Sequence, residues 1–441
     1  MTDDHGAWAT GYNGCAETPA IDALRRGGVF FSNAFAATPV CSPSRMTYIT
    51  GKMPSTHGIQ DFLLPEDAAG PASPRFLAGQ LTYTELLAKS GYTLALCGKW
   101  HMGQDETAQA GFTWWATVPG GGGTYRSPAF VKNGKKLKTE GFKTDMQGDW
   151  ALEFLDGVNR AKPFFLMVPF YAPHTPYDFY PEQDGKAYDG SKFPCFPNTP
   201  MNPNQNSNLA KNLGREESKR AYSALVTGAD RNIQRILKKL DEMRVRENTL
   251  VIFTADQGFN TGHHGVWGKG NGTVPYNMYE ESIRVPMIWN HPARIRGGTT
   301  ADAMISSYDF FPSILEYLGV KAPADSKRVG RSYASFLSGS APKQWRDRLY
   351  FEYAYTRCIR TRTLKYIERT KDWPSELYDL EADPGEKKDV FADPTYASRL
   401  KDLQNDLHRF FERSGAPRLE DWRSTTKQHL PERERATPRG G

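Results

Sequence analysis

Short apolar segments alternate with amphipathic segments along the first three quarters of this 441-residue chain. The segment 92–98 is apolar almost throughout, which is typical of strands buried on both faces of a parallel sheet. Residues 220–243 carry one apolar stripe with helical spacing. This alternation predicts an α/β fold, with a mostly parallel central sheet sandwiched by helices. The predicted core strands are 29–35, 92–98, 163–170 and 250–254.

The sequence pattern changes after about residue 335. Three segments of partial alternation, 348–352, 358–361 and 364–368, predict antiparallel strands, and 397–412 predicts an amphipathic helix. We therefore expect a catalytic α/β domain over 1–335 and a small α+β subdomain over 336–423. The charged segment 424–441 is predicted to be a frayed tail.

Charge and cysteine content exclude several classes of protein. A net charge of +6 is far from the footprint of a nucleic-acid-binding protein. No apolar run is long enough to span a membrane. The five cysteines are scattered, odd in number and without a CxxC pair, which argues against a disulfide framework or a zinc site. The cysteines do not determine the redox compartment.

The start of the chain has the pattern of a strand end followed by a loop. Residues 1–6 include no signal peptide, and the apolar strand expected to lead into them is absent. This pattern is compatible with an internal start, with the strand and any export signal lost upstream. A periplasmic or extracellular location therefore stays open.

The segment Cys41-Ser42-Pro43-Ser44-Arg45 carries the first chemical signal. Pro43 disfavours helix just before it and suits the first turn of a helix. Cys41 is therefore expected at a helix N-terminus, where backbone N–H groups favour an anion. Arg45 adds a permanent charge whose fork geometry suits sulfate, phosphate or carboxylate. A buried cysteine beside a structural proline turn is the alternative reading.

Two acidic segments follow predicted strand ends. Asp3 and Asp4 lie at the first, and Asp256 and Gln257 follow the strand 250–254. Adjacent carboxylates repel unless a cation lies between them, and strand ends are where open α/β sheets bind ligands. Oxygen ligands of this kind suit Ca²⁺ or Mg²⁺ rather than Zn²⁺. For Asp3 and Asp4 alone, a solvated loop is the competing interpretation.

Basic and imidazole side chains follow two further strands. Lys99 and His101 come after 92–98, and His174 lies between prolines after 163–170. Such groups could bind an anionic oxygen and exchange a proton. An exposed lysine beside structural histidines is the alternative where no further motif accompanies them.

Together these motifs resemble those of type I sulfatases. Cys-x-Pro-x-Arg is followed by Thr50-Gly51-Lys52-Met53-Pro54-Ser55-Thr56-His57-Gly58, a tail typical of that family. Gly98-Lys99-Trp100-His101, the block 262–269 and the segment 376–386 also match family motifs. The resemblance covers nearly the whole chain and implies an alkaline-phosphatase-like fold.

The resemblance implies a site and its chemistry. In this family a formylglycine-generating enzyme oxidises the cysteine, and the hydrated aldehyde attacks a sulfate ester beside a divalent metal, usually Ca²⁺. The implied catalytic residues are Cys41, Arg45, Lys99, His101, His174, His264 and Lys269, and the implied metal ligands are Asp3, Asp4, Cys41, Asp256 and Gln257. Two departures are Gln257, where many members have Asn or His, and a longer insert after Lys269.

The expected activity is therefore hydrolysis of a sulfate ester, with a sulfated carbohydrate as substrate. Two alternatives remain open at this stage. One is a phosphonate monoester or phosphodiester hydrolase on the same scaffold. The other is a non-catalytic protein that binds sulfated glycans, in which Cys41 is never oxidised.

Overall fold

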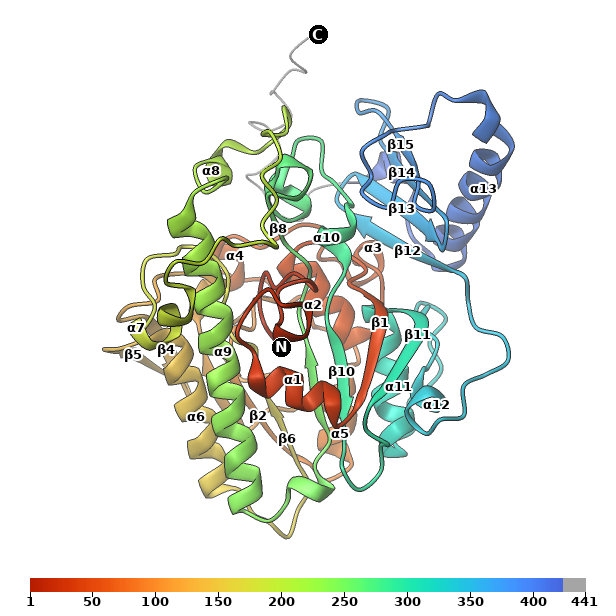
Figure 1. The fold of residues 1–441 in the computed structure, drawn as a ribbon. Helices are drawn as coiled ribbons and strands as arrows, with labels where there is room; N and C mark the ends of the chain where they lie inside the picture. The colour runs from red at the N-terminus through yellow and green to blue at the C-terminus, as the bar shows by residue number, and fades with distance from the viewer. Residues whose placement is uncertain (423–441) are drawn as a thin grey trace.

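The computed structural model describes residues 1–422. Its helices and strands alternate as the sequence predicts, and they form an α/β body with a smaller domain at the C-terminal end (Figure 1). The predicted tail 424–441 lies outside the described residues. The α-helices are α1 (Pro19–Arg26), α2 (Cys41–Thr50), α3 (Pro54–His57), α4 (Pro65–Ala68), α5 (Tyr83–Lys89), α6 (Lys143–Gly157), α7 (Glu182–Gly185), α8 (Ser207–Ala210), α9 (Glu216–Glu242), α10 (Glu280–Ile283), α11 (Phe310–Leu318), α12 (Ala334–Leu337) and α13 (Ala397–Arg413).

Two sheets of mixed strand direction form the body. The first has the order β11-β1-β10-β7, with β1 and β11 parallel and the other pairs antiparallel. The second has the order β5-β4-β3-β2-β6, with β3, β2 and β6 parallel. Their strands are β1 (Val29–Phe35), β2 (Thr93–Gly98), β3 (Trp114–Thr117), β4 (Ala129–Lys132), β5 (Lys135–Lys138), β6 (Phe164–Met167), β7 (Val251–Thr254), β10 (Met287–Asn290) and β11 (Thr299–Ser306).

The first residues of the chain lie between these two sheets. The Thr2 amide donates to Thr254 O at 3.1 Å, and the Asp256 amide donates to Thr2 O at 3.1 Å. On the other side the Met1 amine donates to Val168 O at 3.2 Å. This short segment therefore extends the hydrogen bonding from the end of β7 to the end of β6. The acidic pair that follows it emerges beside Asp256.

Strand β2 shows why helices cover both faces. Its side chains alternate: Leu94 and Leu96 pack on one face in a cluster that includes α5, whereas Ala95 and Cys97 pack on the other among residues of α6. A strand buried on both sides must be apolar at successive positions, which is the pattern of 92–98. Figure 1 shows α6 and α9 side by side along the second face. The predicted α/β architecture is confirmed.

The N-terminus of α1 is capped by a carboxylate from a distant helix. Thr18 occupies the N-cap position, but its side chain makes no capping bond and instead accepts from the Gly11 amide. The amides of Ala20 and Ile21 donate to the buried Asp230 carboxylate of α9, at 3.0 and 2.7 Å. A carboxylate 210 residues downstream thus supplies the cap.

The C-terminal domain is an antiparallel sheet with one long helix. Strands β12 (Arg348–Tyr353), β13 (Thr356–Thr361), β14 (Leu364–Arg369) and β15 (Glu376–Asp379) pair in chain order, and α13 packs against them. Its core is continuous with the body, because Phe351 and Tyr353 share an apolar cluster with Val40 and Cys41. The predicted antiparallel subdomain is confirmed, and it lies directly behind Cys41.

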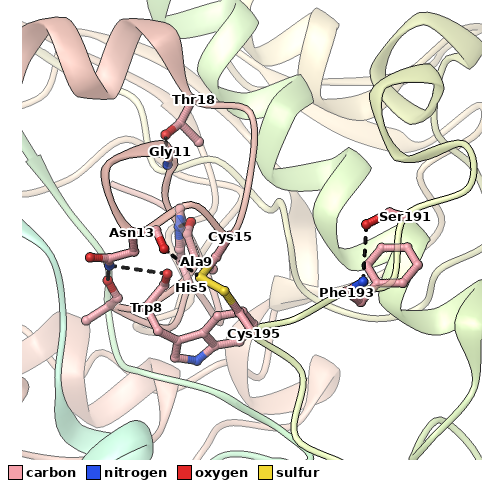
Figure 2. Close-up of a disulfide and its surroundings, with 11 residues drawn as sticks. His5, Trp8, Ala9, Gly11, Asn13, Cys15, Thr18, Ser191, Phe193 and Cys195 are labelled. Atoms are coloured by element: carbon pink, nitrogen blue, oxygen red, sulfur yellow. Dashed lines mark hydrogen bonds between the residues drawn. A yellow bond between two sulfur atoms is a disulfide. The ribbon is translucent and has the colours of Figure 1, made fainter.

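A disulfide joins Cys15 to Cys195, and this corrects the cysteine argument above. Figure 2 shows this bond linking the loop before α1 to the long segment between β6 and α9. No local spacing indicates this pair, because 180 residues separate its two cysteines. Cys41, Cys97 and Cys358 are free and buried. Within residues 1–422, no helix combines the length and the apolarity needed to cross a bilayer.

Replacing both bridged cysteines by serine is expected to lower the free energy of unfolding by about 2–5 kcal/mol, because the bridge closes a very long loop in the unfolded chain. The measurement is the urea midpoint of the oxidised protein and of the C15S/C195S variant. Dithiothreitol should lower the midpoint of the wild type only. Alkylation of both thiols in denatured, unreduced wild type would contradict the bridge.

Candidate active site

Cys41 is the first residue of α2, as predicted from Pro43. The preceding Val40 has extended backbone angles, and no side chain caps the helix start. Pro43 contributes no N–H group, so the first turn presents its remaining amides at Cys41 and Ser42. Cys41 is 3% exposed. A nucleophile at this position lies where the helix dipole favours negative charge.

Three carboxylates converge beside Cys41 from two loops. Asp3 and Asp4 follow the segment that pairs with β7, and Asp256 follows β7 itself. All three are buried. The Asp4 amide donates to Asp256 Oδ1 at 3.3 Å, and Asp4 adopts a left-handed backbone, with φ of 59°. Because the two loops leave neighbouring strand ends, residues 252 positions apart meet at one edge.

Arg45 holds one of these carboxylates. Its Nε and Nη2 donate to Asp256 Oδ2 at 3.0 and 2.8 Å, and its Nη1 donates to Lys99 O at 2.6 Å. The Ser44 hydroxyl donates to the Asp256 carbonyl. The sequence predicted a fork geometry that suits sulfate, phosphate or carboxylate, and the donors of Arg45 here hold a carboxylate and the strand end that carries Lys99.

Two lysines hold the other carboxylates. Lys99 Nζ lies 2.5 Å from Asp3 Oδ2, and Lys269 Nζ lies 2.6 Å from Asp4 Oδ1. Lys269 Nζ also lies 3.8 Å from Cys41 Sγ. Three buried carboxylates are thus matched by three buried cations around one sulfur atom. Lys269 reaches this position because it directly follows β9 (Trp267–Gly268), which pairs with β8 (Asn260–Thr261).

Neighbouring charges oppose the effect of burial at Asp3 and at Lys269. Burial alone would raise the pKa of Asp3, but Lys99, His174 and Arg45 outweigh it and hold that pKa well below its usual range. Burial would likewise lower the pKa of Lys269, but the neighbouring Asp4 raises it above the ordinary lysine value. These shifts favour the carboxylate form of Asp3 and the ammonium form of Lys269 at neutral pH, whereas burial and the neighbouring Asp3 raise the pKa of Asp256 well above its usual range.

Two buried oxygen atoms at this site, Asp3 Oδ1 and Gln257 Oε1, have no hydrogen-bond partner among residues 1–422. The Gln257 amide nitrogen donates to Asp4 Oδ1, so its carbonyl oxygen lies in the same cluster. Unpartnered buried oxygens are costly unless a donor or cation meets them. Carboxylate and amide oxygens are what Ca²⁺ and Mg²⁺ prefer. The residues therefore fit a hard divalent cation.

His101 has one free ring nitrogen. Its Nε2–H donates to Leu63 O at 2.9 Å, which leaves Nδ1 as the lone-pair atom, and Nδ1 is buried without a partner. Its amide donates to Asp105 Oδ1 at 3.0 Å. Burial, together with Lys99 and Arg45, holds the pKa of His101 well below its usual value. A neutral imidazole with an open Nδ1 can accept a proton.

His174 approaches the cluster from the end of β6. Its Nδ1–H donates to Thr175 O, and its Nε2 lies 3.6 Å from Asp4 Oδ2. Its ring packs 4.9 Å from the ring of Tyr171. Burial lowers the pKa of His174 to about 4, although both aspartates oppose this shift. One carboxylate oxygen each of Asp3 and Asp4 and one ring nitrogen of His174 lie within 4.8 Å of one another.

His264 lies in a different set of contacts. Its ring stacks on Tyr279 with centroids 4.0 Å apart, and its Nε2 lies 2.7 Å from Glu281 Oε2. Glu386 Oε2 of the C-terminal domain is 3.8 Å away. Of the described residues, none of the cluster around Cys41 hydrogen-bonds to this ring. The structure thus groups the other predicted residues and sets His264 beside them, on the loop that leads to Lys269.

Sequence reasoning missed three residues that adjoin the site: Asp105, Tyr171 and Lys143. Asp105 holds the His101 amide, and its four-residue spacing from His101 was the available signal. Tyr171 stands three residues before His174 and packs on it. Lys143 had no sequence signal, because a single lysine at a helix start is usually exposed, whereas this one is 0% exposed.

Comparison with known proteins identifies the family. A sequence model described as Sulfatase matches residues 1–320. The chain belongs to the sulfatase family. A second model, described as the C-terminal region of N-sulphoglucosamine sulphohydrolase, matches residues 262–413. An N-acetylglucosamine-6-O-sulfatase from Bacteroides thetaiotaomicron is 27% identical, over 91% of this chain and 84% of that protein. The chain is accordingly a sulfatase of alkaline-phosphatase-like fold.

Solved structures agree with this assignment. The structure of BT4656 in complex with its substrate D-glucosamine-2-N,6-O-disulfate has a TM-score of 0.80 and 26% identity, covering 96% of this chain and 98% of that chain. A phosphonate monoester hydrolase from Silicibacter pomeroyi has a TM-score of 0.72 at 20% identity, covering 94% of each chain. The second likeness concerns the fold alone.

The buried Asp105 carboxyl should make stability depend on pH. Burial raises its pKa to about 8, whereas an unfolded chain has a value of about 4, so only the folded state keeps the proton between these values. The stabilisation is therefore lost as pH rises from about 4 to about 8. Asp105→Asn, which cannot titrate, should show a smaller fall in Tm between pH 5 and pH 8 than the wild type.

The matched control for this comparison is Asp302→Asn on β11, because that aspartate is exposed and pairs with Arg362 at the surface. Its Tm should follow the wild-type pH dependence. Equal slopes for Asp105→Asn and the wild type would contradict the assignment of a protonated carboxyl at position 105.

Proposed function

We propose that this sulfatase hydrolyses a sulfate ester of a carbohydrate, with residue 41 as formylglycine and a divalent cation, Ca²⁺ or Mg²⁺, held by Asp3, Asp4, Asp256 and Gln257. A formylglycine-generating enzyme is the partner that would modify Cys41. The family assignment supports the activity class, and the convergence of buried charges on Cys41 supports the site.

The balance of charge is the observation that carries the proposal. Three carboxylates and three cations already compensate one another around Cys41. A divalent cation would make the cluster net positive, which suits an anionic ester rather than a neutral one. When bound, the metal would polarise an oxygen of the sulfuryl group.

The side chains have separate tasks. Lys269 Nζ lies 3.8 Å from the Cys41 sulfur and stays ammonium, so it can bind a sulfuryl oxygen and stabilise the departing alcohol. Lys99 offers a second ammonium beside Asp3. The open Nδ1 of His101 can take a proton from residue 41 when sulfate is released. His174 Nε2 faces the same cluster from the opposite loop.

The sugar class rests on the relatives. The N-acetylglucosamine-6-O-sulfatase and the BT4656 complex both concern a sulfated glucosamine, and both alignments extend over more than nine-tenths of this chain. We therefore propose the 6-O-sulfate of N-acetylglucosamine as the first substrate to test. The phosphonate monoester hydrolase keeps the rival activity open through its shared fold.

A formylglycine at position 41 is expected in protein made with a formylglycine-generating enzyme. Mass spectrometry of the peptide carrying Cys41 should find the aldehyde or its hydrate. Cys41→Ala should lower kcat by at least about 10³-fold, because the nucleophile is lost. The control Cys358→Ala removes a buried thiol of β13 and should keep activity. An unmodified thiol in a fully active sample would contradict the proposal.

Removal of the divalent cation should abolish turnover. Treatment with EDTA is expected to lower kcat more than about tenfold, and Ca²⁺ or Mg²⁺ should restore it. Added Ca²⁺ should also raise Tm, because it binds only the folded cluster. Asp256→Asn should lose both responses, whereas the exposed Asp302→Asn should keep them. Undiminished activity in EDTA would count against a metal-dependent site.

Substrate class is tested by comparing kcat/KM for N-acetylglucosamine 6-sulfate, an aryl sulfate and an aryl phosphonate monoester. We expect the sugar sulfate to exceed the phosphonate ester by at least about 10²-fold, since the chain belongs to the sulfatase family and aligns with a glucosamine sulfatase over most of its length. A preference for the phosphonate ester would favour the rival activity. Binding of the sugar sulfate without turnover, by formylglycine-bearing protein with metal, would favour the non-catalytic alternative.

A further inference from the structure

Lys143 is a buried cation that the mechanism above does not use. It is the first residue of α6 and is 0% exposed. Among residues 1–422, no carboxylate forms an ion pair with its ammonium group. Burying a charge without an ion-pair partner costs free energy, and such groups are often found at functional sites. Burial, together with Lys99, lowers the pKa of Lys143 to about 7, while Asp178 and Asp3 oppose the shift.

The ammonium group of Lys143 instead binds a glycine-rich loop, residues 120–123, here termed the strap. Its Nζ donates to Gly122 O at 3.1 Å and to Gly123 O at 2.9 Å. Its own backbone amide donates to Tyr125 O at 2.8 Å, just beyond the strap. Lys143 thus ties the strap to the first turn of α6 by two hydrogen bonds from one side chain.

The strap lies directly against His101. A Cβ atom built at Gly121 would lie 2.2 Å from His101 Cδ2, and Gly121 has φ of +66°. Only glycine allows this approach and this backbone angle without strain. The imidazole is therefore held by the strap and by its hydrogen bond to Leu63 O, while Asp105 accepts a hydrogen bond from the backbone amide of His101. Of these contacts, the strap is the one that Lys143 holds.

Lys143 also contacts Tyr171, whose ring packs on His174. Its Nζ lies 3.7 Å from the centre of the Tyr171 ring, a favourable distance for a cation–π contact. Lys99 Nζ lies 5.6 Å from the same ring, and the ring of His174 packs 4.9 Å from it. One buried ammonium group therefore contacts the supports of both imidazoles.

We propose that Lys143 is a positioning residue of this sulfatase, whose ammonium group presses the strap against His101 and holds Tyr171 against His174. It acts through these neighbours and does not touch the substrate. The inference rests on the proposed function, because it assigns His101 and His174 to the reaction. Misplacing catalytic groups by about 1 Å can cost about 10²-fold in rate, so the effect of losing these contacts of Lys143 should be measurable.

Three variants separate the positioning role of Lys143 from an effect on general stability. Lys143→Met keeps side-chain length but removes both the donors and the charge, and Lys143→Gln keeps an amide donor without the charge. Lys136→Met is the matched control, because Lys136 is exposed on β5 and its one ion pair within residues 1–422 is with Glu106. Readouts are kcat and KM with N-acetylglucosamine 6-sulfate, Tm, and hydrogen–deuterium exchange of peptides covering 118–126.

We expect Lys143→Met to lower kcat about 10–100-fold with less than about a threefold change in KM, and to speed amide exchange in the strap. Lys143→Gln should recover part of kcat and part of the protection, because its amide can donate to one carbonyl. Lys136→Met should match the wild type. A kcat within threefold of wild type for Lys143→Met, or unchanged exchange in the strap, would overturn the proposal.

The two proposals fail in different ways. If formylglycine-bearing wild type turns over no sulfate ester, the proposed function fails, and strap exchange in the variants still decides whether Lys143 holds the strap. If Lys143→Met does not fold, Lys143→Gln carries the test, with a fall in kcat of at least threefold and faster strap exchange expected. Wild-type kcat and exchange in Lys143→Gln would then overturn the role of Lys143.

Discussion

The structure depends on the mutual neutralisation of three buried carboxylates and three buried cations at one edge of the sheets. Each carboxylate alone would resist burial, and each cation alone would lose its charge or its place. Paired, they fix the loops after Thr2, β2, β7 and β9 in one arrangement around Cys41. The same pairing leaves Asp3 Oδ1 and Gln257 Oε1 without partners, which is why the cluster suits a metal.

The layers of the fold supply the edge on which this cluster forms. Residues 1–3 hydrogen-bond on both sides, to the ends of β7 and β6, and so carry the acidic pair between the sheets. Behind Cys41, the antiparallel C-terminal sheet shares an apolar cluster with the start of α2. Cys41 is therefore supported by both parts of the chain, and Glu386 Oε2 lies 3.8 Å from His264 Nε2.

Much of this arrangement was predictable from local pattern. The apolar segment 92–98 indicated a strand buried on both faces, and Pro43 indicated the start of a helix at Cys41; both predictions are confirmed. Asp256, Lys99 and His174 were found because each follows an apolar segment, whereas Asp3 and Asp4 were found as adjacent carboxylates at the start of the chain. Local pattern does not reveal the cap of α1: Thr18 stands at the N-cap position, but Asp230 of α9 supplies the hydrogen bonds.

The sequence by itself determined the elements, the family and the residue types at the strand ends, because these depend on periodicity and on short motifs. Only the tertiary structure decided which side chains meet. It paired Cys15 with Cys195, turned the donors of Arg45 to Asp256, set His264 against Tyr279 and buried Lys143 over Tyr171. Contacts of this kind join residues that are distant along the chain, and their energies depend on burial and direction, which no local pattern records.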